Sequence, residues 1–199
     1  MRDDFYWTTL SAVGLTAGVS SALLLGTPVE KVVGMMLVTP ILTALVGSIL
    51  GTAQWFPLHR RVGVSIYSWV TATTLGLCAG LAAGVVLVEQ TGRFLTGGRV
   101  HLLQLGIPAR FLSFAVLGFV SGLLLGLAQQ VALRRAPVAM RRWALASAIA
   151  LAVGFSIASL LVDLVSGLVL ASPTGLLLFL LTAGSLYGAI TSHALRRAV

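Results

Sequence analysis

The stretch GTAQWFPLHRR (residues 51–61) returns as GLAQQVALRR (126–135) and, more faintly, as GAITSHALRR (188–197). Each copy runs from a glycine to a polar residue three positions later, and then to a leucine and a basic pair. A pattern that returns in this way indicates an internal repeat, so we expect the chain to be built from like units.

The composition is typical of a membrane protein. Of the 199 residues, 58% are hydrophobic and only 9% are charged, and the mean hydropathy is +1.03. Uncharged runs of about 20 residues are long enough to cross a hydrocarbon core as helices, and the period-two alternation of strands is absent. We therefore predict an all-α integral membrane protein, a single domain over residues 1–199, with six transmembrane helices at about 7–26, 32–57, 66–88, 109–133, 143–170 and 175–195.

The repeat covers most of the chain. The segments that begin at Trp7, Trp69 and Trp143 align without gaps, and a glycine follows each tryptophan by eleven residues. The units are therefore about 7–61, 69–135 and 143–197, each a hairpin of two helices. Because two crossings return the chain to the same side, the three units are predicted to be parallel and related by a pseudo-threefold axis along the membrane normal.

The basic residues predict the orientation. Twelve of the thirteen are arginine, a bias that suggests a GC-rich bacterial genome. Nine fall on the side of the termini and four on the other side, so both termini are expected to be cytoplasmic, in a bacterial cytoplasmic membrane. The nine are Arg2, Arg60, Arg61, Arg134, Arg135, Arg141, Arg142, Arg196 and Arg197, and the four are Lys31, Arg93, Arg99 and Arg110.

Pairs of glycines four residues apart close each unit and share one helix face. Such faces let two helix backbones approach closely, so we interpret them as packing seams, with a glycine-lined substrate path as the alternative. These helix-packing residues are Gly47, Gly51, Gly122, Gly126, Gly184 and Gly188.

A polar residue follows each glycine pair on the same face: Gln54, Gln129 and Thr191. The first interpretation is a hydrogen-bonded clamp between helices, and the second is a polar ring that selects a solute. The basic pairs after them are expected to contact anionic lipid headgroups or a cytoplasmic partner. They are Arg60, Arg61, Arg134, Arg135, Arg196 and Arg197.

Acidic residues inside membrane spans are candidates for function. Glu89 and Asp163 each lie twenty residues after a tryptophan, near the far end of a first helix. Either they pair with outer arginines or they have a functional role such as proton coupling, and Asp163 is the strongest single candidate.

The remaining aromatic and histidine residues suggest no cofactor. Trp7, Trp69, Trp143 and Trp55 are predicted to form an aromatic belt at the cytoplasmic boundary. The histidines lie near boundaries or in a loop, and no paired mid-membrane ligands for haem occur. No nucleophile elbow, phosphate loop, paired carboxylate or metal cluster is present, so we expect neither catalysis nor a cofactor, and we expect no nucleic-acid partner.

The middle unit carries an insertion at about residues 89–110 on the outer face. Its apolar residues are punctuated by Arg93, Arg99 and Arg110. An amphipathic segment in the interface, a lid over an outer cavity, or a contact with another subunit would each fit this composition.

Few polar groups, abundant small-residue seams and an apolar insertion favour a non-catalytic integral membrane protein, an accessory or scaffold subunit of a larger bacterial complex. Its partners would be the lipid bilayer and other membrane subunits. The alternative is a small-solute transporter or a substrate-binding transporter subunit, with a site near Asp163, Gln54, Gln129 and the outer loop. In size and six-helix topology the chain is similar to the substrate-binding subunits of energy-coupling-factor vitamin transporters.

Overall fold

A computed structural model describes residues 2–33, 35–96, 106–134, 142–164 and 173–196, and these form six helices. Largely apolar runs of about 20 residues without a charged side chain account for this single type of element, because a helix bonds its backbone groups internally. The helices are α1 (Arg2–Val33), α2 (Met35–Val62), α3 (Ile66–Thr96), α4 (Ile107–Ala132), α5 (Trp143–Leu164) and α6 (Pro173–Arg196).

All six helices are long and apolar enough to cross a membrane, which confirms the predicted all-helical, multi-pass class. Their candidate spans are Phe5–Gly26, Leu37–Arg60, Ile66–Thr91, Ile107–Ala132, Trp143–Val162 and Thr174–Leu195.

Several helices are longer than predicted. The prediction ended the first helix at about residue 26 and the third at about residue 88, but helix α1 continues to Val33 and α3 to Thr96. Both continue past Glu30 or Glu89, because a charged residue at the membrane boundary stops burial in lipid but does not break a helix. Much of the 89–110 insertion is thus helical, in α3 and at the start of α4, while residues 97–105 lie outside the described residues. The predicted end of helix 5 at residue 170 lies outside them too.

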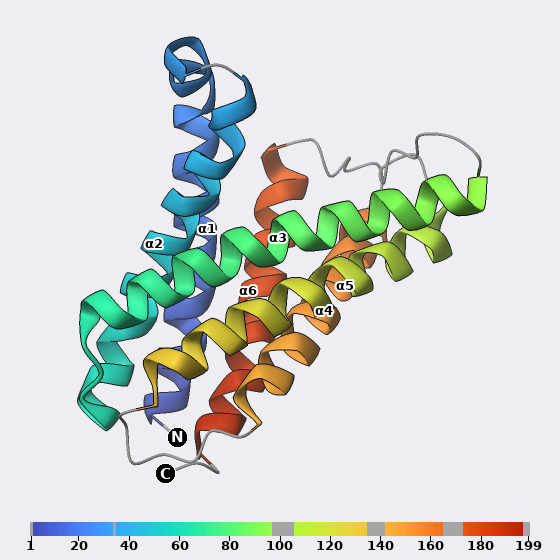
Figure 1. Ribbon diagram of the computed structural model, residues 1–199. Helices are drawn as coiled ribbons and strands as arrows, with labels where there is room; N and C mark the ends of the chain where they lie inside the picture. The colour runs from blue at the N-terminus through green and yellow to red at the C-terminus, as the bar shows by residue number, and fades with distance from the viewer. Residues whose placement is uncertain (1, 34, 97–105, 135–141, 165–172, 197–199) are drawn as a thin grey trace.

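The helices form a closed ring. Among the described helices, each contacts the one before and the one after it in the chain, and α6 contacts α1. Figure 1 shows both chain termini at one end of the bundle, which also holds the turn between α2 and α3. Toward the other end, the α1–α2 hairpin rises away from the α3–α4 hairpin (Figure 1). We call the end that carries the termini the terminal end.

The turn between α2 and α3 is short because of one glycine. Gly63 has φ +64°, a conformation that costs little only without a Cβ, and its N–H donates to the His59 carbonyl at 2.9 Å. This is the usual left-handed end of a helix. The ring nitrogens of Trp55 and His59 both lie on the Val64 carbonyl, at 2.9 and 3.1 Å, and so hold the turn against α2.

Glycines set the distance between neighbouring helices. A Cβ added at Gly47 would lie 2.7 Å from the Thr74 Cα, and one at Gly184 would lie 2.8 Å from the Ala12 Cα. The equivalent Cβ at Gly122 would lie 2.8 Å from the Ala148 Cα. Real Cβ contacts are essentially never this short, so each of these helix pairs could approach so closely only with glycine there.

The second glycine of each pair lies against the same neighbouring helix as the first. An added Cβ would lie 3.1 Å from the Val70 Cα at Gly51, 2.6 Å from the Ala144 Cα at Gly126, and 2.6 Å from the Thr8 Cα at Gly188. The glycines that close α2, α4 and α6 therefore face α3, α5 and α1 respectively.

Candidate functional site

Three tryptophans meet at the centre of the ring near the terminal end. Trp7, Trp69 and Trp143 are 1%, 0% and 2% exposed, and their ring centroids lie 6.0 to 6.4 Å apart with edge-to-face geometry. Each such aromatic pair is worth about 0.5–1.5 kcal/mol beyond the burial of its surface. We call these three residues the tryptophan cluster. Leucines that precede the basic pairs pack around it: Leu58, Leu133 and Leu195.

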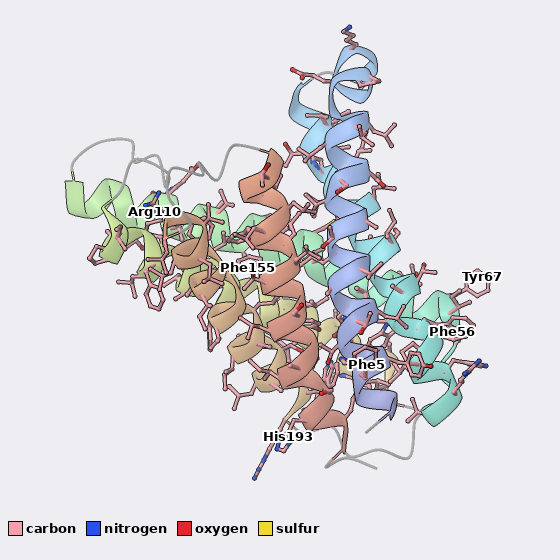
Figure 2. All side chains as sticks on the ribbon, turned by 180° about the vertical axis from the view of Figure 1, so that it is seen from behind. Phe5, Phe56, Tyr67, Arg110, Phe155 and His193 are labelled. Carbon is pink, nitrogen blue, oxygen red and sulfur yellow. The ribbon has the colours of Figure 1, made fainter. Side chains whose placement is uncertain are left out.

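The prediction that these three tryptophans form an aromatic belt was wrong. A belt faces the lipid headgroups, whereas these indoles point into the bundle, where two of their N–H groups find side-chain acceptors. Other aromatic residues are exposed instead: Phe5 (69%), Tyr6 (48%), Phe56 (52%) and Tyr67 (82%). Figure 2 shows Phe5, Phe56 and Tyr67 gathered toward the terminal end of the bundle. Aromatic side chains at this level are typical of a membrane–water boundary.

Beside the tryptophan cluster lies a polar layer centred on Gln129, a fully buried residue of α4. Its amide nitrogen donates to the Thr73 hydroxyl at 3.1 Å and to the Gln54 side-chain oxygen at 3.4 Å. Its own side-chain oxygen accepts from the Trp143 indole at 3.0 Å and from the Tyr187 hydroxyl at 3.4 Å. One amide thus joins helices α2, α3, α5 and α6.

Gln54 and Thr191 complete the connections and are also fully buried. The Gln54 amide nitrogen donates to the Ser11 hydroxyl at 3.1 Å, between α2 and α1. The Trp7 indole donates to the Thr191 hydroxyl at 2.8 Å, between α1 and α6. We use "polar layer" for the residues Ser11, Gln54, Thr73, Gln129, Ser147, Tyr187 and Thr191.

The hydrogen bonds of the polar layer follow one rule, with two bonds missing. A hydroxyl lies four residues after each tryptophan, at Ser11, Thr73 and Ser147. Gln54 and Gln129 each donate a hydrogen bond to the hydroxyl of their own unit. Gln129 and Thr191 each accept a hydrogen bond from the indole of the tryptophan that opens the following unit, which for Thr191 is Trp7. The rule leaves two bonds unmade: within the described part of the chain the Trp69 N–H finds no acceptor, and the Ser147 hydroxyl makes no bond with Thr191.

Thr191 accounts for the missing bond to Ser147. Its side chain is too short to reach Ser147 as a glutamine would, and its hydroxyl instead donates back to the Tyr187 carbonyl. Tyr187 stands where the other units have Leu50 and Leu125, four residues before the polar residue. Its hydroxyl lies near Gln54, Gln129 and Ser147. Tyr187, one helical turn before Thr191, thus supplies the polar group that a glutamine supplies in the other two units.

The polar layer consists of uncharged groups that form hydrogen bonds between helices. Its members are amides and hydroxyls, which share hydrogen bonds with one another and with two indoles of the tryptophan cluster, but they carry no charge and include no acid–base pair. In a membrane interior such bonds contribute about 0.6–1.7 kcal/mol each between helices. Among the described residues, no group of three or more His, Cys, Asp or Glu is placed to hold a metal ion.

The two acidic candidates lie far from the polar layer. Glu89 is exposed on α3, sixteen residues after Thr73, and Asp163 is in α5, sixteen residues after Ser147. Sixteen residues correspond to about 24 Å of helix. The structure therefore brings Gln54 and Gln129 together but places neither acid beside them. The side chain of Asp163 lies outside the described residues.

Two of the predicted basic contacts have described side chains, and both lie at the terminal end. Arg60 and Arg134 are exposed, and the Arg60 guanidinium lies 4.4 Å from the centre of the Phe56 ring. Arg61 and Arg196 are helical, with side chains outside the described residues, as are Arg135 and Arg197 entirely. His193 is exposed near the same end (Figure 2).

Sequence reasoning missed the hydroxyls and the roles of the tryptophans. The signal was present in the aligned units, where Trp-x-x-x-Ser/Thr recurs three times. Residues four positions apart on a helix share a face, so each tryptophan and its hydroxyl must point the same way.

No protein family, curated protein or solved structure matches the chain.

Proposed function

We propose that the protein is a non-catalytic helical scaffold or accessory subunit of a larger membrane complex in the bacterial cytoplasmic membrane. The observation that carries this proposal is the polar layer: its buried amides are bonded to neighbouring helices and lie beside a centre filled by three indoles. A site that selects a solute would keep such groups accessible to the solute. Here they hold helices together instead.

The proposal includes a pseudo-threefold arrangement of parallel hairpins. The glycines Gly47, Gly122 and Gly184 each lie against the residue five positions after a tryptophan. Those partners are Thr74, Ala148 and Ala12. Matched contacts at three successive hairpin boundaries support units that are related by rotation and are joined in the same way.

Each unit contributes equally to the centre as well. One tryptophan, one leucine before the basic residues and one polar residue come from every hairpin. The even number of helices and the basic residues at the terminal end support cytoplasmic termini. A closed ring whose centre is filled by buried side chains leaves its outer surface, with the described parts of the 89–110 insertion, as the surface available to partner subunits.

Purification in a mild detergent tests the proposal. We expect partner chains to remain bound in stoichiometric amounts when the protein is isolated from its native membrane at low expression. Isolation as a lone chain that retains a small molecule would contradict the scaffold role and favour the transporter alternative. For that alternative, Asp163→Asn should abolish transport, whereas a scaffold should assemble normally with this variant.

A further inference from the structure

A surface groove lies at the terminal end between the α2–α3 turn and the end of α4. It has a volume of about 590 Å³ and is lined by residues of the turn, including Gly63, by Ser65 and Ser68, and by Val131 and Arg134 of α4. Of the described residues that line it, Arg134 is the one that carries a charge, and none is acidic. Ser65, Ser68 and Arg134 are all exposed.

A second hollow of about 490 Å³ continues the groove along α4. It shares Val131 and Arg134 with the first and adds Leu127 and Gln130, but it lacks the two serines. The surface is therefore more apolar along α4 than beside the α2–α3 turn. Leu127 and Val131 are 44% and 55% exposed. Since they are four residues apart, they form one apolar stripe on the helix.

An aromatic residue beside the groove indicates where the groove lies relative to the membrane surface. Tyr67, between the two serines, is 82% exposed and belongs to the aromatic residues gathered at the terminal end (Figure 2). Exposed tyrosine marks the level of the lipid headgroups. The two serines and Arg134 therefore face headgroups, and the stripe formed by Leu127 and Val131 runs toward the acyl chains.

We propose that this groove is a binding site for one anionic phospholipid. Its phosphate accepts hydrogen bonds from the Arg134 guanidinium and from the hydroxyls of Ser65 and Ser68, and one acyl chain lies along Leu127 and Val131. A guanidinium is suited to a phosphate because its N–H groups match the phosphate oxygens. The site is independent of the scaffold role, since it needs only the bundle and its turn.

The test is native mass spectrometry of the full chain in detergent, titrated with phosphatidylglycerol, with phosphatidylcholine of the same acyl chains, or with inorganic phosphate. We expect one phosphatidylglycerol to bind well before phosphatidylcholine. Arg134→Gln should weaken this binding about fivefold, in keeping with the contribution of one basic residue. Arg60→Gln removes the same charge at the same end but outside the groove, and it should leave binding within twofold of the parent protein.

A third variant separates shape from charge. Val131→Trp fills the groove without altering any charge and should also weaken phosphatidylglycerol binding, while the melting temperature stays near that of the parent protein. Equal losses for Arg60→Gln and Arg134→Gln would overturn the proposal in favour of diffuse attraction. Equal binding of the two lipids, or binding of inorganic phosphate as tight as that of phosphatidylglycerol, would also overturn it.

Discussion

The indole N–H of Trp143 donates to the side-chain oxygen of Gln129 at 3.0 Å, and so the residue that opens the third unit is bonded to the polar residue near the end of the second. Trp7 has the same relationship to Thr191, at 2.8 Å, across the junction that closes the ring. Trp7 and Thr191 are 184 residues apart in the sequence, whereas Gln129 and Trp143 are 14 apart, yet both pairs are bonded in the same way. They therefore report on how the units meet rather than on local helix structure.

Gln129→Leu should destabilise the bundle more than any other single change to an amide. Leucine has a similar volume, but it would leave the Trp143 N–H and the Thr73 hydroxyl without their present partner. A buried polar group left unsatisfied costs about 1–3 kcal/mol. We expect a loss of stability in that range, measured by unfolding in mixed detergent micelles.

The neighbouring amide provides the control. Gln130→Leu changes the same side chain one position along α4, where the residue is only partly buried. It should cost less than half as much as Gln129→Leu. Similar losses for the two variants would show that the polar layer does not clamp the helices.

Tyr187 and Thr191 should be energetically coupled, because together they replace the leucine and glutamine of the other units. Thr191→Gln alone would crowd the Tyr187 ring, and Tyr187→Leu alone would remove a hydroxyl that bonds Gln129. The double variant Tyr187→Leu with Thr191→Gln restores the pattern of the other two units. It should be more stable than the sum of the single changes by about 1 kcal/mol or more in a double-mutant cycle. Additive effects would mean that Tyr187 does not substitute for a third amide.

The sequence predicted the elements of the fold well, because charge-free runs and repeated glycines are local signals. It also identified Gln54, Gln129 and the glycine faces, since residues three or four apart on a helix share a face. It did not predict which neighbouring helix each face meets. That depends on the order of helices around the ring, which a single sequence does not encode in any short pattern.

The tryptophans show most clearly where local reasoning fails. An indole near a membrane boundary can face the lipid in a belt or lie buried with a hydrogen-bond partner, and its local sequence does not separate the two. Trp7 and Trp143 are buried, whereas Trp55 is only partly buried. The periodic hydroxyls at Ser11 and Thr73 were the signal for burial. A polar group four residues from an indole on the same face needs a partner, and lipid offers none.

Glycine-to-alanine substitutions should separate packing from helix propensity. At Gly122 an added Cβ would overlap the Ser147 carbonyl oxygen of α5, and that backbone atom has no freedom to rotate away. We expect Gly122→Ala to cost about 1–3 kcal/mol by overpacking. At Gly26 the nearest atom to an added Cβ is the flexible end of Leu42, at 3.5 Å. Gly26→Ala should be neutral or stabilising by up to about 1 kcal/mol, because alanine favours helix. Equal effects at the two sites in a thermal melt would remove the argument for close approach at Gly122.

The Trp69 N–H, which has no partner among the described residues, gives the last prediction, because Trp69 and Trp143 differ mainly in hydrogen bonding. Both are buried and both contact the other members of the tryptophan cluster at 6.0–6.4 Å. Tryptophan-to-phenylalanine changes remove a similar volume at each site, but only Trp143→Phe also removes the bond to Gln129. Trp143→Phe should therefore be less stable than Trp69→Phe by about 0.6–1.7 kcal/mol, the usual range for an interhelical bond in a membrane protein. Unfolding followed by the fluorescence of the remaining tryptophans measures both variants in the same way. If Trp69→Phe proved the more damaging of the two, the Trp69 indole would have to make a bond that the rule of the polar layer assigns to it, with Gln54 as the acceptor.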